Sequence, residues 1–391
     1  NLSIFDEYSI EWLKEQEGRV DFINGFIEVY GDPLGLKASW EGIVEYKDLE
    51  ATQRTQTIST NAQWFEDHSP VDPRFRKERV KGVTANVINA AMLGGDEYPS
   101  TAIGINLPNA DWIRAEHGSK SVTIGNLTHA YNMASHGNGF LEEFVIDNET
   151  LEIITTFGDK TDDLHTDLHE CLGHGSGKLL QGTDPDALKN YGNTIEEARA
   201  DLFGLYYIAD AKLLELGLLD SKEAYKAQYY SYLMNGLLTQ QVRIKPNMKI
   251  EESHMQNRAL IAWWAMDLGK EKNIIEFVTR NSKTYIKIND YTALRSIFAT
   301  ELAEIQRIKS EGDFNAARTL VEKYAIHLNK NQHEEVLARY KQLNIAPYKG
   351  FINPVLKPIF DNNKKIVDIA IDYTESYSEQ MLRYSREYST L

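Results

Sequence analysis

The sequence predicts an α+β protein, because two kinds of hydrophobic periodicity divide the chain. Roughly the first third alternates apolar and polar residues and is interrupted by turn formers, which is typical of β-strands. After about Asp162, apolar residues recur every three or four positions, as on the buried face of a helix. At roughly 150 residues per domain, a chain of 391 residues is long enough for two or three domains.

Three segments are expected to be extended. Residues 19–30 (RVDFINGFIEVY) alternate around Asn24-Gly25, which predicts a hairpin with its turn at that dipeptide. Residues 121–124 and 144–156 are also expected to be extended, the second with a turn at Asp147-Asn148. These segments would supply the β part of the fold.

Helical spacing begins at Leu164, Leu168 and Leu172, which recur every four residues. The same periodicity predicts helices over residues 195–208, 221–238, 260–275, 291–308 and 315–328. Pro246 is expected in a loop before one of these helices, and residues 347–358 begin a looser C-terminal part.

Composition excludes several classes of partner. With 58 acidic and 42 basic residues, the formal charge of −16 argues against nucleic acid or an anionic membrane surface as partner. The longest uncharged apolar stretch, residues 259–266, is too short to span a bilayer. The single cysteine, Cys171, cannot form an internal disulfide, so a cytoplasmic location is expected. Because the chain opens on Asn1 rather than methionine, we expect a processed product or a piece of a longer protein.

The residues most indicative of chemistry are His169, Glu170 and His174. Two histidines four residues apart on a helix can share one zinc ion, and a glutamate directly after the first can take a proton from the metal-bound water. Here the histidines are five residues apart, which turns the second about 140° away on a regular helix. They can share a metal only if the helix absorbs the extra residue, most simply as a π-bulge at Gly173, which has no Cβ.

An alternative pair is His165 and His169, which have the regular spacing of four. Thr166 follows His165 and cannot act as a general base, so this pair would explain a metal site without hydrolysis.

A second acidic segment lies about twenty residues beyond His174, on an amphipathic helix. Two neutral imidazoles and one carboxylate from Glu197 would form a three-ligand site with an open position. Asp201 lies one turn from Glu197 and can accept the outer N–H of a ligand histidine. Taken without the histidine motif, the segment is more simply a solvated acidic helix face.

Residues 169–178 (HECLGHGSGK) followed by 196–201 (EEARAD) resemble the paired signature of dipeptidyl peptidase III, a family of zinc exopeptidases. Residues 26–33 (FIEVYGDP), 106–109 (NLPN) and 254–258 (HMQNR) also resemble segments of that family, in the same order. The resemblance therefore covers most of the chain.

The resemblance implies one zinc ion per chain, with His169, His174 and Glu197 as ligands and Glu170 as general base on the zinc-bound water. It implies further roles for the following residues: Glu196 and Asp201 support the ligand histidines; Glu28, Asn106 and Asn109 hold the free α-amine and first residues of the peptide; Tyr30 and His254 stabilise the oxyanion; and Arg258 positions substrate or His254.

Taken alone, these substrate-side residues have simpler interpretations. Asn106 and Asn109 flank a proline as turn formers do. Glu28 and Tyr30 alternate on an expected strand and would face solvent, while His254 and Arg258 are one turn apart and would form a surface patch.

The resemblance also implies a domain organisation. Family chains are longer, and an N-terminal region completes a β-rich lower lobe across a cleft from the mostly helical zinc-bearing lobe. Residues 1–48, 90–136 and 346–391 would belong to the lower lobe, and residues 49–89 and 137–345 to the helical lobe. The N-terminal lobe of the full-length chain would then be a missing partner.

The expected function is a zinc-dependent dipeptidyl peptidase that hydrolyses the second peptide bond from the free N-terminus of short peptides. One alternative is a catalytically inactive, zinc-stabilised peptide-binding fragment that lacks its N-terminal lobe. Another is a zinc hydrolase that does not act on peptides and needs no amine pocket.

Overall fold

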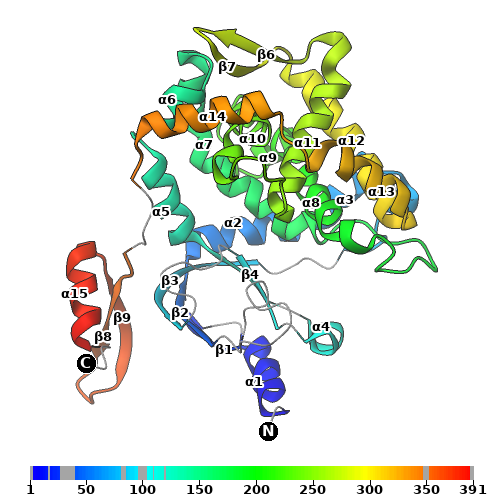
Figure 1. Cartoon of the computed structure of the whole chain (residues 1–391). Helices are drawn as coiled ribbons and strands as arrows, with labels where there is room; N and C mark the ends of the chain where they lie inside the picture. The colour runs from blue at the N-terminus through cyan, green and yellow to red at the C-terminus, as the bar shows by residue number, and fades with distance from the viewer. Residues whose placement is uncertain are drawn as a thin grey trace. The chain divides into compact units, whose positions relative to one another are not determined.

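A computed structural model describes residues 3–15, 18–26, 40–80, 85–95, 104–108, 110–118, 120–346 and 352–387. Its helices and strands confirm the α+β class (Figure 1). The chain divides into two compact units, one of residues 1–53, 85–134 and 347–391, the other of residues 54–84 and 135–346.

The first unit contains a five-stranded sheet in the order β1-β2-β3-β5-β4. Its strands are β1 (Val20–Gly25), β2 (Glu41–Lys47), β3 (Ala85–Gly95), β4 (Gly104–Leu107) and β5 (Lys120–Ile124). Only β3 and β5 pair in parallel, and the other neighbours are antiparallel. Ile23 lies opposite Ile43, which lies opposite Leu93, so one face of the sheet carries a continuous buried row.

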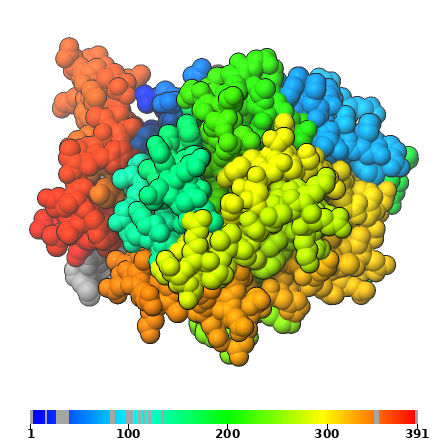
Figure 2. Space-filling model, turned by 90° about the horizontal axis from the view of Figure 1, so that it is seen from above, coloured from blue at the N-terminus to red at the C-terminus, as the bar shows by residue number. Residues whose placement is uncertain are grey.

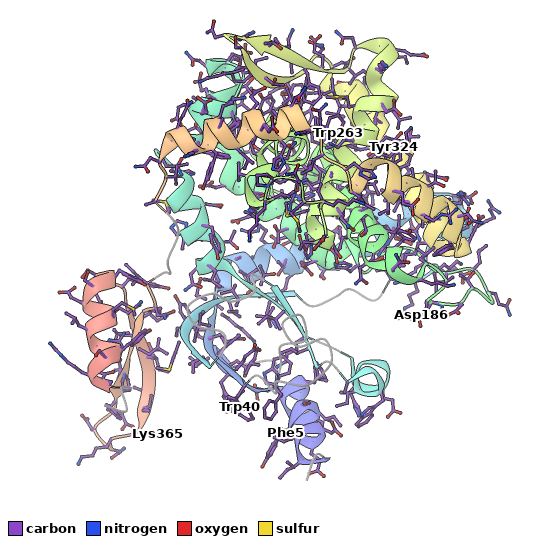
Figure 3. The ribbon with its side chains drawn as sticks, viewed as in Figure 1. Phe5, Trp40, Asp186, Trp263, Tyr324 and Lys365 are labelled. Atoms are coloured by element: carbon purple, nitrogen blue, oxygen red, sulfur yellow. The ribbon has the colours of Figure 1, made fainter. Side chains whose placement is uncertain are left out.

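Four helices and a hairpin complete the described part of this unit, which also includes the start of α2 (Leu49–Thr60). The helices of the N-terminal part are α1 (Ser3–Lys14), α4 (Asp111–His117) and α5 (Gly125–Ser135). Phe5 of α1 meets Trp40 with ring centroids 6.4 Å apart (Figure 3). The C-terminal part consists of β8 (Val355–Phe360), β9 (Ile366–Asp372) and α15 (Tyr377–Glu387). The hydroxyl groups of Tyr46 and Tyr373, 2.7 Å apart, connect it to β2.

The second unit is mainly helical, and its centre is formed by five helices. They are α7 (Asn148–Leu168), α8 (Gly192–Ile208), α10 (Tyr225–Leu237), α11 (Ser253–Gly269) and α12 (Tyr291–Glu311). Helix α8 packs against α7, α11 and α12, and so lies at the centre of the unit. Among the described residues, the further α-helices are α2 (Leu49–Thr60), which begins in the first unit, and α3 (Ala62–Asp67), α6 (Phe140–Phe144), α9 (Ala211–Glu215), α13 (Phe314–Leu320) and α14 (Lys330–Leu343). The green, yellow and orange parts of this unit lie closely against one another (Figure 2).

Two local predictions are wrong. Asn24 and Gly25 do not form a hairpin turn, because both belong to β1 and pair with Gly42 and Glu41 of β2. Asn-Gly favours a turn, but here the pairing of β1 with β2, a strand further along the chain, outweighs that local preference. Residues 144–156 are not extended either, since α7 begins at Asn148 and the Asp147 side chain accepts a hydrogen bond from the Thr150 N–H at 2.9 Å. Aspartate is favoured both in turns and as a helix N-cap.

Most of the other predicted segments are confirmed, although the helices α1–α5 lie in the part of the chain that was expected to be strand-like. The extended segment at residues 121–124 is confirmed as part of β5, and the four helices predicted between residues 195 and 308 are confirmed as α8, α10, α11 and α12. The third of them ends at Gly269, before the hairpin β6 (Ile275–Arg280) and β7 (Lys283–Ile288), which the periodicity missed. The helix predicted over 315–328 is α13, which continues as a π-helical turn at Val321–Ala325. Among the described residues, no helix combines the length and apolarity that crossing a membrane requires.

Candidate metal centre

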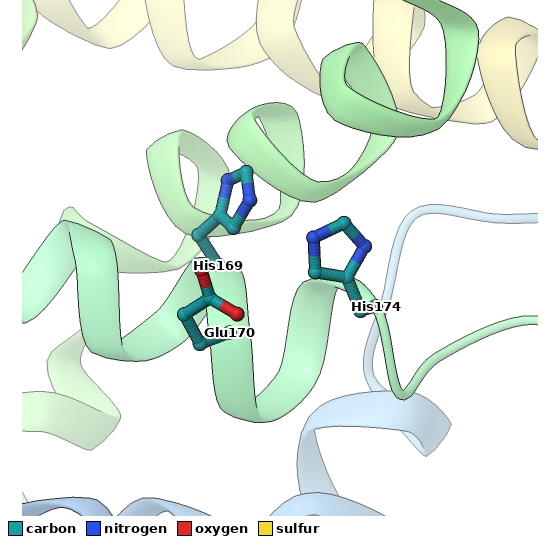
Figure 4. Close-up of side chains that lie close together, drawn as sticks. All are labelled: His169, Glu170 and His174. Atoms are coloured by element: carbon teal, nitrogen blue, oxygen red, sulfur yellow. The ribbon is translucent and has the colours of Figure 1, made fainter. Parts of the chain in front are cut away.

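The end of α7 carries the predicted distortion. The helix passes directly into a π-helical turn over His169–Gly173, and the His174 N–H donates to the His169 carbonyl oxygen at 3.1 Å. This five-residue hydrogen bond absorbs the extra residue between the two histidines, which confirms the predicted π-bulge. The two rings lie on the same side of the chain, with centroids 4.7 Å apart (Figure 4).

Gly173 has a further role that the sequence did not reveal. A Cβ atom at this position would lie 2.7 Å from the Cα and 2.8 Å from the Cβ of Ala200 on α8. The π-turn therefore approaches α8 to a distance that any side chain would prevent. This close approach brings the acidic side chains of α8 within reach of the histidines.

Glu197 of α8 faces both histidines. Its Oε2 lies 3.3 Å from His169 Nε2 and 4.0 Å from His174 Nε2. The same oxygen is buried and has no hydrogen-bond partner among the described residues. Burial by itself raises the pKa of Glu197, but the nearby imidazoles of His169 and His174 hold that pKa below its ordinary value.

These residues fit a zinc ion. Ligand atoms about 2.0–2.1 Å from a tetrahedral zinc are roughly 3.3 Å from one another, close to the shorter of the two distances at Glu197. A buried carboxylate oxygen without a partner costs free energy unless a cation or donor satisfies it. Glu170 also belongs to the cluster, because ligand-type atoms of His169, Glu170 and His174 all lie within 4.8 Å of one another.

Each histidine is oriented by a carboxylate on its other ring nitrogen. His169 Nδ1 lies 2.7 Å from Asp201 Oδ1, and His174 Nδ1 lies 2.8 Å from Glu196 Oε1. Such contacts fix Nδ1 as the protonated nitrogen and leave Nε2 to face Glu197. Burial lowers the pKa of His169, but Asp201 and Glu197 together raise it well above its ordinary value.

Two cations hold Glu196. Arg199 donates to both of its oxygens, from Nη2 to Oε1 at 2.7 Å and from Nε to Oε2 at 3.0 Å. Lys309 of α12 forms an ion pair with Oε2. Burial would raise the pKa of Glu196, but Arg199 and His174, with Lys309, hold it well below its ordinary value.

Two neutral donors hold Asp201. The Tyr232 hydroxyl donates to Oδ2 at 2.6 Å, and the Asn257 amide donates to the same oxygen at 2.7 Å. Burial would raise the pKa of Asp201, but the hydrogen bond and charge of His169 keep that pKa far below its usual range.

Sequence reasoning missed all four of these partners. Arg199 and Asn257 lie inside the motifs EEARAD and HMQNR, so inspection of those motifs could have found them. Tyr232 and Lys309 lie on other helices and carry no local signal.

The alternative ligand His165 lies outside the cluster. It is buried, and its Nε2 is 3.1 Å from the Asp201 backbone oxygen. A Cβ at Gly204 would lie 2.6 Å from its ring, so His165 packs where α7 meets α8. Burial lowers the pKa of His165, as expected for a neutral ring in this place.

The substrate-side residues are only partly described. His254 of α11 is 59% exposed, and its Nδ1 lies 3.5 Å from Glu197 Oε2, so the structure brings it to the cluster. Arg258, one turn further on, lies 3.5 Å from Gln240 Oε1 through its Nη1. Asn106 lies in β4, but its side chain is outside the described residues, as are Glu28, Tyr30 and Asn109.

The fold and this cluster define an α+β protein with a histidine–carboxylate centre of the type that metallohydrolases use. The family model of peptidase family M49 matches residues 1–191 and 184–347. The chain belongs to peptidase family M49, which confirms the resemblance to the dipeptidyl peptidase III family.

Known relatives agree with this assignment. Dipeptidyl peptidase 3 of Homo sapiens is 26% identical over 354 residues, and that of Rattus norvegicus 25% over 354 residues. Each alignment covers 80% of this chain and 47% of the relative, so the chain spans about half the length of these relatives. The structure of DPP III from Caldithrix abyssi matches with a TM-score of 0.72 and 22% identity, covering 87% of this chain and 62% of that one.

Proposed function

We propose that this chain carries the metal centre of a zinc-dependent dipeptidyl peptidase, which hydrolyses the second peptide bond from the free N-terminus of short peptides. The observation that carries the proposal is the buried Oε2 of Glu197, which has no hydrogen-bond partner among the described residues and faces the Nε2 atoms of His169 and His174. The name shared by the relatives supports the reaction class.

His169, His174 and Glu197 would hold one zinc ion per chain. When bound, zinc supplies a Lewis acid that polarises a carbonyl group and lowers the pKa of water. Glu197 is assigned as the ligand rather than Glu170 because its Oε2 lies 3.3 Å and 4.0 Å from the two Nε2 atoms, and the resemblance gives Glu170 the role of general base. Glu196 and Asp201 orient the two rings by accepting from their Nδ1 atoms.

Glu170 is the proposed general base. It follows His169 in the π-turn and lies with both histidines (Figure 4). Its carboxylate takes a proton from the attacking water and returns that proton to the nitrogen of the leaving amine. Positioned proton transfer of this kind contributes roughly 10²–10⁴-fold to the rate.

His254 is the proposed donor to the developing oxyanion, because it is exposed and lies beside Glu197. The resemblance adds Tyr30 to this role and Arg258 as a positioning residue. It also assigns Glu28, Asn106 and Asn109 to the amine and first residues of the peptide, since an ammonium group needs carboxylate and amide oxygens.

The domain assignment and the location in the cell stay predictions. We propose that residues 1–48, 90–136 and 346–391 form part of a lower lobe, which an N-terminal lobe absent from this chain completes. Relatives twice as long as the aligned region support this view. A cytoplasmic location rests on the single cysteine, Cys171.

The test combines zinc content with dipeptidyl-arylamide hydrolysis. We expect one zinc per chain in the wild type, and Glu170→Gln should keep the zinc and lose about 10²–10⁴-fold in activity. Glu152→Gln, on the exposed face of α7, is the matched control and should keep both. Full activity of a zinc-loaded Glu170→Gln variant would contradict the mechanism.

Two further results would indicate the alternatives. Stoichiometric zinc and peptide binding without turnover would indicate an inactive peptide-binding fragment. Equal turnover of N-acetylated and free-amine peptides would exclude an exopeptidase.

A further inference from the structure

The carboxylate of Asp201, on α8, is contacted by side chains from three other elements of the second unit: the π-turn after α7, α10 and α11. Oδ1 receives the His169 contact at 2.7 Å, and Oδ2 receives hydrogen bonds from Tyr232 of α10 and Asn257 of α11. All four residues are buried. Both hydrogen bonds go to Asp201 and not to a proposed zinc ligand, and the resemblance to the family assigned neither Tyr232 nor Asn257 a role.

The chemistry of an ionised carboxylate fixes the direction of these bonds. It only accepts, so both the Tyr232 hydroxyl and the Asn257 amide must donate. Burial, and secondly the charge of Asp201, raise the pKa of Tyr232 well above its ordinary value, so the hydroxyl keeps its proton. Asn257 is 1% exposed, and its Oδ1 has no hydrogen-bond partner among the described residues.

The Asn257 Oδ1, without a partner among the described residues, indicates whether this side chain serves for packing or as a hydrogen-bond donor. A buried amide with a free carbonyl oxygen costs desolvation free energy that an apolar side chain of similar shape would not. What the amide supplies in this position is its donor to Asp201. Asn257 therefore acts through its hydrogen bond to Asp201.

We propose that Tyr232 and Asn257 are positioning residues that fix Asp201 and, through it, the His169 ring. Two donors on Oδ2 hold the carboxylate in one rotamer, with Oδ1 alone facing His169 Nδ1. His169 Nε2 then points toward Glu197, 3.3 Å away. Without these donors, Asp201 has other rotamers and the ring loses its fixed direction, which weakens metal binding.

Asn257 also connects α11, which carries His254, to α8, which carries Glu197 and Asp201. It lies three residues after His254 on α11, and His254 Nδ1 is 3.5 Å from Glu197 Oε2. Its hydrogen bond to Asp201 therefore sets the position of α11, and of His254, relative to α8. The inference rests on the proposed zinc site and deepens it.

The test measures the zinc dissociation constant by chelator competition and the thermal unfolding of the metal-free protein. Tyr232→Phe removes the hydroxyl that donates to Asp201. Tyr229→Phe is the matched control, because Tyr229 is a buried residue of the same helix and its hydroxyl donates to the Leu205 carbonyl at 2.9 Å. We expect both variants to unfold at similar temperatures. Tyr232→Phe should bind zinc about 10-fold more weakly than wild type, and Tyr229→Phe within about twofold.

Asn257→Leu provides a second variant in case Tyr232→Phe does not fold, and it should also weaken zinc binding by about 10-fold. Wild-type zinc affinity in either folded variant, or equal weakening in Tyr229→Phe, would overturn the inference and leave the proposed function standing. A wild-type protein that binds no zinc would instead overturn the proposed function, and the inference with it.

Discussion

Asp201 and Glu196 lie on the same helix and orient one histidine each, but they are held in opposite ways. Neutral donors, Tyr232 and Asn257, occupy the outer oxygen of Asp201. The cations Arg199 and Lys309 bind Glu196. The negative charge of Asp201 is thus balanced mainly by His169, whereas the negative charge of Glu196 is balanced by the Arg199 and Lys309 side chains.

This difference separates two kinds of support for a metal centre. A carboxylate without a cationic partner raises the basicity of the histidine that it holds, and so contributes to metal affinity. A carboxylate paired with a fully buried arginine is a structural ion pair, whose loss leaves an uncompensated charge in the protein interior. We therefore expect Asp201 to act mainly on zinc binding and Glu196 mainly on the stability of the second unit.

The largest effect is expected for Arg199→Met. Arg199 is 0% exposed and also donates to the Ser176 backbone oxygen at 3.0 Å. Its removal leaves that carbonyl without the Arg199 donor and leaves Glu196 with Lys309 as its remaining cationic partner from another helix. We expect a loss of about 3–5 kcal/mol in the free energy of unfolding of the metal-free protein, measured by urea denaturation. A loss below about 1 kcal/mol would show that Glu196 is not held as a structural ion pair.

Asp201→Asn compared with Glu196→Gln tests the contrast directly. Asp201→Asn should weaken zinc binding by roughly 10–100-fold, or about 1.4–2.7 kcal/mol, because His169 loses its anionic partner. Glu196→Gln should weaken it less, since the charge that it removes is already neutralised, but it should unfold more easily. Zinc titration of the two variants side by side checks the order, and the reverse order would refute the comparison.

Glu301 of α12 differs from both, because it is a buried acid with neither a neutral donor nor a cation bonded to it among the described residues. Both of its oxygens lack a hydrogen-bond partner among the described residues, and burial raises its pKa well above the ordinary value. Since the folded pKa exceeds the unfolded one, stability is fully present below the unfolded pKa and is lost as the pH rises through the folded pKa.

Glu301→Gln should therefore be nearly as stable as wild type at pH 5 and more stable at pH 8, by about 1–3 kcal/mol. Urea unfolding of both proteins across this range measures the difference. A stability difference that does not change with pH would mean that Glu301 keeps an ordinary pKa.

The smallest effect is expected for Lys309→Met. Although Lys309 also pairs with Glu196, its side chain is 32% exposed, so solvent screens the interaction. A loss of about 0.5–1 kcal/mol is expected, clearly below that of Arg199→Met in the same urea experiment. Equal losses would show that the two cations share the charge of Glu196.

The predicted fold succeeded where the signal was local or strongly periodic. The five-residue spacing of His169 and His174 requires a π-turn if both rings are to face one side, and the structure contains it. The errors came from short segments with two possible uses. Asn24-Gly25 can turn or continue a strand, and Asp147-Asn148 can turn or start a helix.

The sequence by itself determined the two histidines, their spacing and the acidic segment that follows, because helix geometry converts residue spacing directly into direction. Only the tertiary structure decided which carboxylate faces which histidine and what holds each carboxylate. Tyr232 is 31 residues from Asp201, and Lys309 is 113 residues from Glu196. These pairs form because α10, α11 and α12 pack around α8, and packing between distant helices leaves no periodic mark in the chain.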